Sequence, residues 1–262
     1  MKRYIPFMKS DPTVSVVRLD GLIASGRGLN DSEIGQALER AFAKKPAAVA
    51  LVINSPGGSP VQSALIGARI RRLAEEKEVP VYAFVEDVAA SGGYWLAAAA
   101  DEIFVDRASI IGSIGVISAG FGFQDAIEKY GVERRVYTAG KSKSMNDPFK
   151  APKPEDITRL KGLLEDIHTV FIDHVQTRRA AKLTDDDRLF TGEIWVGQKG
   201  VDVGLADALG HLVPTLKERF GDKVRLRYFG RRKSILNRLG ARLLGDLNYS
   251  IEERAAYAQF GL

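Results

Sequence analysis

The run Ala48-Val49-Ala50-Leu51-Val52-Ile53 is followed at once by Asn54-Ser55-Pro56-Gly57-Gly58-Ser59. An apolar run of this length predicts a strand that is buried on both faces, as in a parallel sheet. The proline- and glycine-containing stretch behind it predicts a turn where the strand ends. Ligands of parallel α/β sheets gather at the carboxyl ends of strands, so this turn is the first candidate for a functional site.

Strand and helix patterns alternate on both sides of this run. Strands are predicted at Val14–Leu19 and Pro80–Val85, and Asn30 or Asp31 is expected to cap the first helix. This alternation predicts an α/β fold with a largely parallel sheet flanked by helices. The helix after the glycine turn is expected to present one apolar side, made of Val61, Leu65, Ala68 and Leu73.

Further elements follow in the second half of the chain. Short strands are predicted at Ile103–Val105, Ile114–Ile117 and Val132–Tyr137, with a short helix at Phe123–Tyr130. Pro154 begins the clearest helix of the chain. Its apolar residues recur at three- and four-residue spacings, at Ile157, Leu160, Leu164, Ile167, Phe171 and Val175.

The character of the chain changes after Gly230. One main domain is predicted over residues 1–230 and a basic amphipathic extension over residues 231–262. Three docking sites are open for this tail: its own domain, a sister subunit, or a membrane surface. Its helical face is predicted from Ile235, Leu239, Leu243 and Leu247.

Composition excludes several classes of function. The 262 residues contain no cysteine, which rules out disulfides, thiolate nucleophiles and cysteine-bound metal centres. A net charge of +5 is too small to indicate nucleic-acid binding. No cofactor or metal is expected. The longest uncharged apolar run, Val88–Ala100, is too short to span a bilayer, so a cytoplasmic or membrane-peripheral location is predicted, and an anchor in a longer precursor stays open.

A second glycine motif is Val88-Ala89-Ala90-Ser91-Gly92-Gly93-Tyr94-Trp95. Ser91 stands at the entry of a small apolar segment that is predicted to be helical. The glycines behind it allow close backbone approach, and a helix start offers unpaired amide groups. These features suit a buried nucleophile, although a purely structural helix start has the same pattern.

A serine nucleophile needs a base. His168 and His174 fall within the long helix, away from the glycine loops, and His211 precedes a late helix, so all three are expected to be structural or exposed. A lysine can serve instead when burial lowers its pKa from about 10.4 towards 7. Lys141 and Lys143 are the candidates, because both lie in a glycine- and serine-rich loop.

Four motifs in this order resemble the signal peptide peptidase A family of serine proteases. They are Asn54-Ser55-Pro56-Gly57-Gly58, Ala90-Ser91-Gly92-Gly93-Tyr94, Gly112-Ser113-Ile114-Gly115-Val116 and Gly140-Lys141-Ser142-Lys143. The resemblance extends from about Val14 to Phe229 and implies a fold of the Clp protease and crotonase type.

The resemblance also implies a mechanism. It assigns Ser91 as the nucleophile and Lys143 as the general base, and places Ser113 where the family holds the lysine. Gly58 falls where an oxyanion donor lies. It further implies a ring-shaped homo-oligomer with Ser91 and Lys143 from different chains, acting on short or unfolded hydrophobic polypeptides such as cleaved signal peptides. Members of the family commonly have an N-terminal membrane anchor, and none is visible in this sequence. The basic tail is a candidate for a partial substitute, through peripheral membrane contact.

Two other functions fit the glycine loops. A crotonase-like acyl-CoA hydratase, isomerase or thioesterase would use the same oxyanion logic, but Asn54, Ser55 and Ser91 stand where an acid would be expected. An inactive scaffold of the same fold is the second alternative. A serine-reactive phosphonate should label a serine protease but not a crotonase-like enzyme. Turnover of an unfolded polypeptide is expected from a protease and not from an inactive scaffold.

Overall fold

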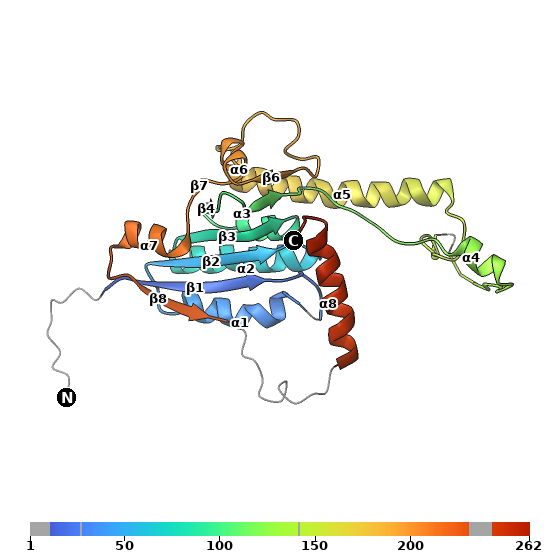
Figure 1. Ribbon diagram of the computed structural model, residues 1–262, viewed down its shortest axis with the longest axis horizontal. Helices are drawn as coiled ribbons and strands as arrows, with labels where there is room; N and C mark the ends of the chain where they lie inside the picture. The colour runs from blue at the N-terminus through green and yellow to red at the C-terminus, as the bar shows by residue number, and fades with distance from the viewer. Residues whose placement is uncertain (1–10, 27, 141, 231–242) are drawn as a thin grey trace.

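The computed structural model describes residues 11–26, 28–140, 142–230 and 243–262, without the side chains of 243–250 (Figure 1). Its centre is an eight-stranded sheet in which the order β6-β5-β3-β2-β1-β8 is continued by β4 and β7 beside β3. All strand pairs are parallel except β5 with β6. The strands are β1 (Thr13–Asp20), β2 (Ala48–Ser55), β3 (Val81–Ala90), β4 (Glu102–Val105), β5 (Ile110–Gly112), β6 (Ile194–Val196), β7 (Ala208–Leu209) and β8 (Arg225–Phe229).

The predicted α/β fold is confirmed, with helices packed against the sheet. No helix in the described ranges has the length and low polarity that are needed to cross a bilayer. The helices are α1 (Asp31–Phe42), α2 (Pro60–Lys77), α3 (Gly92–Ala98), α4 (Gln124–Lys129), α5 (Pro154–Arg179), α6 (Gln198–Asp202), α7 (Leu212–Phe220) and α8 (Leu243–Ala258).

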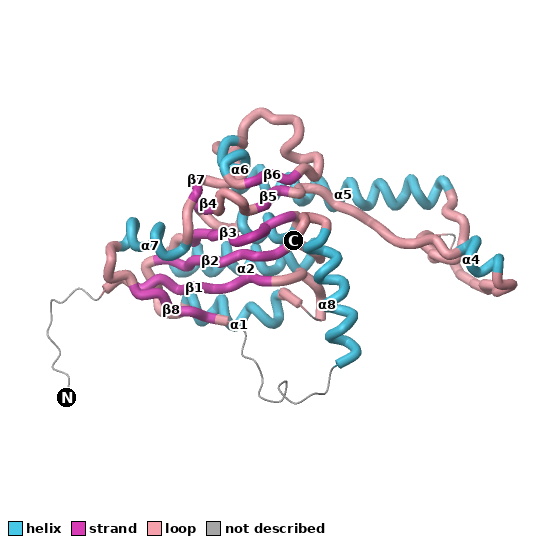
Figure 2. The backbone as a smooth tube through the Cα atoms, viewed as in Figure 1, coloured by secondary structure: helices cyan, strands magenta, loops and turns pink. Residues whose placement is uncertain are grey.

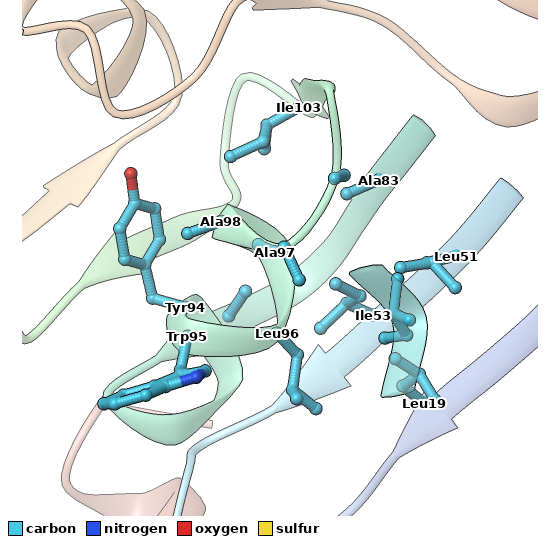
Figure 3. Close-up of a cluster of buried hydrophobic side chains, with 14 of the residues drawn as sticks. Leu19, Leu51, Ile53, Ala83, Tyr94, Trp95, Leu96, Ala97, Ala98 and Ile103 are labelled. Carbon is cyan, nitrogen blue, oxygen red and sulfur yellow. The ribbon is translucent and has the colours of Figure 1, made fainter. Parts of the chain in front are cut away.

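The main core lies between one face of the sheet and helices α1, α2 and α3. Strand β2 is buried nearly throughout, as its apolar run predicts. Figure 3 shows α3 over this face, with Ala97 and Ala98 beside Leu96 and the strand residues Leu51 and Ile53. Small side chains on α3 allow the helix to approach the sheet closely, and each buried leucine or isoleucine contributes about 1.5–3 kcal/mol. A smaller cluster with α7 covers part of the opposite face.

Helix α1 begins as the sequence predicts, because the Asn30 side chain accepts a hydrogen bond from the Glu33 amide. The predicted face of α2 is confirmed only at Leu73, which is buried. Val61 and Leu65 are 65% and 47% exposed, and the buried side carries Ile66 and Ile70. This side also includes Ser63 and Gly67, and the gap at Gly67 admits Trp95 of α3. Small and polar residues on the packed face therefore obscured the pattern.

Two predicted strands are also corrected. Strand β5 covers Ile110–Gly112 rather than Ile114–Ile117, because Ile111 pairs with Ala89 of β3 on one side and with β6 on the other. The chain leaves the sheet after that point. Residues Val132–Tyr137 form no strand in the described structure, and Tyr137 is 91% exposed, because no neighbouring strand pairs with them.

Residues 117–153, which we call the arm, project from the sheet edge and return through α5 (Figure 2). Helix α4 within the arm has no buried residue. The predicted apolar face of α5 is buried only at its second half, at Phe171 and Val175, whereas Ile157 and Ile167 are exposed. The first half of α5 extends beyond the sheet and contains no buried residue.

The C-terminal part of the chain returns to the sheet. Strand β8, which the sequence pattern did not indicate, pairs with β1. In α8, the Glu253 carboxylate accepts from the Leu22 amide at 3.3 Å, and the Tyr257 hydroxyl donates to the Asn54 carbonyl at 2.8 Å. Of the three docking sites open for the tail, its own domain is the one these contacts support. Ile235 and Leu239 lie outside the described residues, as do the side chains of Leu243 and Leu247, so the boundary at residue 230 stays a prediction.

A buried ion pair fixes α5 to the β7 region. The Arg179 side chain is 1% exposed, and its Nη1 donates to Asp207 at 2.7 Å while Nε and Nη2 donate to the Gly204 carbonyl. Burial raises the pKa of Asp207, but hydrogen bonds from Arg179 and Lys182 outweigh burial and hold the pKa below its ordinary 3.8. The carboxylate is thus an anchor for α5.

Asp207→Asn is expected to lower the free energy of unfolding by about 3 kcal/mol, because it leaves the Arg179 charge buried without a partner. The folded-state pKa of Asp207 is lowered, so its contribution is complete at neutral pH and is lost as pH falls through that pKa, below about 4. Urea unfolding at pH 7 and in the acid range measures both effects. The exposed Asp20→Asn is the control, expected to cost less than about 1 kcal/mol; equal losses in the two variants would contradict the assignment.

Candidate active site

Ser91 occupies a strained turn between β3 and α3. Its backbone has φ 51° and ψ −122°, a conformation that costs a non-glycine residue about 1–3 kcal/mol. The Ser91 amide donates to the Gly112 carbonyl at 2.9 Å, and the Ser91 carbonyl accepts from the Trp95 amide at 3.0 Å. These bonds and the buried α3 hold the turn, which presents a partly exposed serine side chain.

Two glycines are required where the backbone crowds Ser91. A Cβ atom on Gly57 would stand 2.8 Å from the Cβ of Ser91, and one on Gly92 would stand 2.4 Å from the Oγ of Ser63. Neither position can therefore take a side chain without displacing its neighbours. The glycine turn after β2 is pressed directly against the candidate nucleophile.

Two unpaired amides flank Ser91. The amide of Gly58 has no hydrogen-bond partner in the described part of the chain. Its two neighbours do bond to Ile23: the Gly57 carbonyl accepts from the Ile23 amide, and the Ser59 amide donates to the Ile23 carbonyl. Gly92 is the first residue of α3, so its amide has no partner within the helix. The Gly58 nitrogen lies 3.4 Å from the point where a Cβ on Gly92 would stand. The two donors are therefore close enough to bind one oxygen atom.

A cavity of about 570 Å³ opens beside these groups. Ser91, Ser113 and Gly58 all line it, so three of the four predicted site residues share one cavity. Leu22, Trp95, Phe171 and Val116 supply apolar wall, and Ala256 and Phe260 from the C-terminal segment complete the boundary. The cavity therefore combines a hydroxyl, free amide donors and an apolar surface.

Ser113 also has a positive φ, of 51°. Its amide donates to the Glu193 carbonyl at 2.8 Å, and its carbonyl accepts from the Gly115 amide at 2.9 Å. The preceding residue, Gly112, accepts from the Ser91 amide. The two serine turns are therefore joined through the backbone, although they are 22 residues apart.

Lys143 does not join this group within one chain. It lies in a turn of the arm, where its backbone amide donates to the Gly140 carbonyl at 3.2 Å. Lys143 is exposed. The described residues that line the cavity include no lysine. Figure 1 shows the region around α4 well away from the end of β3. Lys141 is outside the described residues.

The histidine expectations need one correction. His168 lines the cavity together with Ser91, so it is not remote from the glycine loops. His174 is structural, since its ring stacks on Trp95 at 4.4 Å and burial lowers its pKa. His211 is exposed and pairs with Asp106. Sequence reasoning missed His168 because it falls on the apolar side of a long helix; its spacing of three residues from Phe171 was the available signal.

No group of three or more histidine, aspartate or glutamate side chains in the described ranges is arranged to hold a metal ion. The polar groups of the described lining are hydroxyls, one imidazole, the carboxamide of Gln259 and backbone amides. This donor set suits acyl transfer, in which an alcohol attacks a carbonyl and amides bind the oxyanion.

Comparison with known proteins places this site in a family. The chain is 46% identical over 286 aligned positions to the Na(+)/H(+) antiporter NhaA of Brucella melitensis, covering 100% of this chain and 39% of that protein. It is 34% identical over 170 positions to the chloroplastic serine protease SPPA of Arabidopsis thaliana, covering 64% of this chain and 25% of that protein. The chain thus spans well under half of either relative.

A solved structure supports the fold. It is a lysine-to-alanine mutant of the 1510-N membrane-bound stomatin-specific protease in complex with a substrate peptide, with a TM-score of 0.51 and 14% identity, covering 88% of this chain and 97% of that one. This structural similarity supports the expected fold of the Clp protease type. The model of peptidase family S49 matches residues 73–221, more than half of the chain and the part that holds Ser91, Ser113 and Lys143. The chain therefore belongs to peptidase family S49.

Proposed function

We propose that this chain is a serine endopeptidase that cuts short or unfolded hydrophobic polypeptides, such as cleaved signal peptides, by a Ser–Lys mechanism. The observation that carries the proposal is Ser91 itself, held in a strained turn beside the unpaired amides of Gly58 and Gly92. A strained turn with free amide donors beside a hydroxyl matches the needs of an acyl-transfer site.

The proposed reaction is acyl transfer in two steps. The neutral amine of Lys143 takes the proton of the Ser91 hydroxyl as Oγ bonds to the peptide carbonyl carbon. When the C–N bond breaks, the same proton passes to the leaving amine. Water then attacks the acyl-enzyme, giving one proton back through Lys143 to Ser91 and releasing the acid.

The oxyanion of each tetrahedral intermediate is proposed to bind the Gly58 and Gly92 amides. The sequence indicated Gly58 and an unnamed second amide, and the first residue of α3 is the candidate for the second. Donors fixed in the backbone need no reorganisation as charge develops, and one such donor is worth about 10²–10³-fold in rate.

Lys143 is proposed to reach the cavity of a neighbouring copy. In a lone chain it is exposed on the arm, where nothing would desolvate its amine. The arm also displays apolar side chains that are left open to solvent, namely Ile117, Phe121, Phe123, Tyr130, Val132 and Tyr137. An assembly that buries this surface, such as a ring, would bring the amine to a serine and exclude water from both.

The substrate class follows from the cavity wall. Trp95, Phe171 and Leu22 face the same space as Ser91, and no lysine or arginine is among the described lining residues. An apolar side chain next to the cut is therefore favoured over a charged one. Peripheral membrane contact through the tail, residues 231–262, stays a prediction, and residues 231–242 lie outside the described part of the chain.

Digestion of an unstructured peptide library tests this function directly. The assembled wild-type protein is expected to yield cleavage products with small or apolar residues beside the cut, and the Ser91→Ala protein is expected to yield none. Mass spectrometry of both digests reads the activity, the preference and the nucleophile together. Cleavage that persists in Ser91→Ala, or no cleavage by the wild type, would refute the proposal.

Ser113→Ala is expected to give an intermediate loss. It removes a hydroxyl that would hold the Lys143 amine, but no reacting group, so kcat on a hydrophobic peptide ester should fall about 10- to 100-fold. Steady-state kinetics with the wild type and Ser91→Ala as reference points measure the effect. An unchanged kcat would remove Ser113 from the mechanism.

A further inference from the structure

His168 is the imidazole that lines the cavity, among the residues the structure describes. It lies on α5, three residues before Phe171, which is 4% exposed and stacks on Trp95 with ring centroids 5.1 Å apart. Phe171 and the buried Val175 fix this part of α5 to the body of the protein. The imidazole therefore enters the cavity from a rigid support.

The ring makes one defined contact. Its Nε2 lies 3.0 Å from the carbonyl oxygen of Ile114. A carbonyl oxygen only accepts hydrogen bonds, so Nε2 must carry the proton and donate. Ile114 is the residue directly after Ser113, and its own side chain is completely buried. The contact thus joins α5 to the turn that carries the second serine of the site.

This turn is strained. Ser113 has a positive φ and follows Gly112, which also has a positive φ. Its backbone is held by three hydrogen bonds, from the Ser91 amide to Gly112, from the Ser113 amide to Glu193 and from the Gly115 amide to Ser113. From Val116 to Gly122 no backbone amide of the described chain donates to another residue. A strained turn persists only when its surroundings fix it, and His168 supplies the side-chain bond that does so.

We propose that His168 is a positioning residue for the hydrolytic site: it holds the Ser113 turn in the conformation that presents the Ser113 hydroxyl to the incoming amine. The inference rests on the proposed function of Ser91, Ser113 and Lys143. His168 acts through Ile114 and takes no proton from the Ser91 hydroxyl. Its Nε2–H donates to the Ile114 carbonyl, and the proposal assigns no proton transfer to Nδ1, the other ring nitrogen.

Two substitutions at His168 separate these roles. His168→Phe keeps a planar ring but has no donor, and His168→Gln has an amide that can donate to the same carbonyl but cannot act as a base. In the assembled full-length protein, His168→Phe is expected to lower kcat on a hydrophobic peptide ester about 10- to 100-fold, with KM changed less than about threefold. His168→Gln is expected to recover at least a third of the wild-type kcat. His211→Phe, at the exposed histidine that pairs with Asp106, is the matched control and should keep full activity.

Amide hydrogen exchange gives a readout that does not need catalysis. Exchange in residues 113–117 is expected to rise in His168→Phe and to return towards the wild-type rate in His168→Gln, with no change in His211→Phe. A wild type without turnover would refute the proposed function, while the exchange pattern would still decide the role of His168.

Three results would overturn the inference. One is a His168→Phe protein with wild-type kcat. Another is unchanged exchange in residues 113–117. The third is a His168→Gln protein that stays as inactive as His168→Phe although exchange in residues 113–117 has returned to the wild-type rate, which would show that the ring acts otherwise than by holding the turn.

Discussion

Ser91→Ala is expected to lower the hydrolysis of a hydrophobic peptide ester by at least about 10⁴-fold, since Ser91 is, among the described lining residues, the hydroxyl directly before the free Gly92 amide. Ser63, Ser113 and Thr191 also line the cavity, and the Thr191 hydroxyl donates to the Arg188 carbonyl at 2.9 Å. The Ser63 hydroxyl, however, donates to the Ser59 carbonyl at 2.9 Å, and Ser113 lies in the turn that is proposed to orient the lysine. The amides of Gly58 and Gly92 flank Ser91 and would stabilise its oxyanion.

Initial rates with the ester and covalent labelling with a serine-reactive phosphonate measure this effect. Peptide mapping of the labelled wild type should find the phosphonate on Ser91, and the Ser91→Ala protein should stay unlabelled with unchanged thermal unfolding. A label on Ser63 or Ser113, or residual turnover above about one part in a hundred, would contradict the assignment. Labelling at Ser91 would also exclude the crotonase-like alternative, which has no serine nucleophile.

Lys143→Ala is expected to produce a loss of similar size, because the Ser91 hydroxyl would have no base. Lys143→Arg should be equally inactive, since a guanidinium keeps the positive charge but does not release its proton. Lys141→Ala is the matched control in the same loop and is expected to keep most of the activity. Ester kinetics of the three variants measure the role of the amine, and an active Lys143→Arg or an inactive Lys141→Ala would show that the base has been wrongly assigned.

Mixing the two inactive proteins tests whether sites are shared. If Ser91 of one chain works with Lys143 of the next, an equal mixture of Ser91→Ala and Lys143→Ala subunits contains intact pairs. An active site forms only where a Lys143→Ala subunit supplies Ser91 and the neighbouring Ser91→Ala subunit supplies Lys143. In a random equal mixture each of these two positions is correctly filled about half of the time, so about a quarter of the wild-type activity is expected. Native mass spectrometry verifies that mixed assemblies have formed. Mixed assemblies without activity would place both residues in one chain and refute the shared site.

Elements whose side chains pack against the rest of the same chain were predicted well. The apolar run of β2, the cap of α1 at Asn30 and the start of α5 at Pro154 each follow from local chemistry. Errors arose where a pattern depends on a distant partner. Residues Val132–Tyr137 alternate like a strand but have no neighbouring strand in the described chain, and β8 joins β1 although its arginines gave no apolar signal.

The candidate site divides in the same way. The sequence by itself determined the chemical groups, namely a serine between small residues, glycine turns after strands, and lysines in a glycine- and serine-rich loop. These residue types can be read from the sequence because the chemistry requires them whatever their position in the fold. Only the tertiary structure decided which groups meet. Parallel pairing brings the ends of β2, β3 and β5 to one edge, so Gly58, Ser91 and Ser113 share a cavity. Helix α5 adds His168, which lies 77 positions after Ser91 in the sequence, whereas the arm places Lys143 outside the cavity of its own chain. The sequence could not predict either placement, because contacts between remote segments are set by tertiary packing and leave no local pattern.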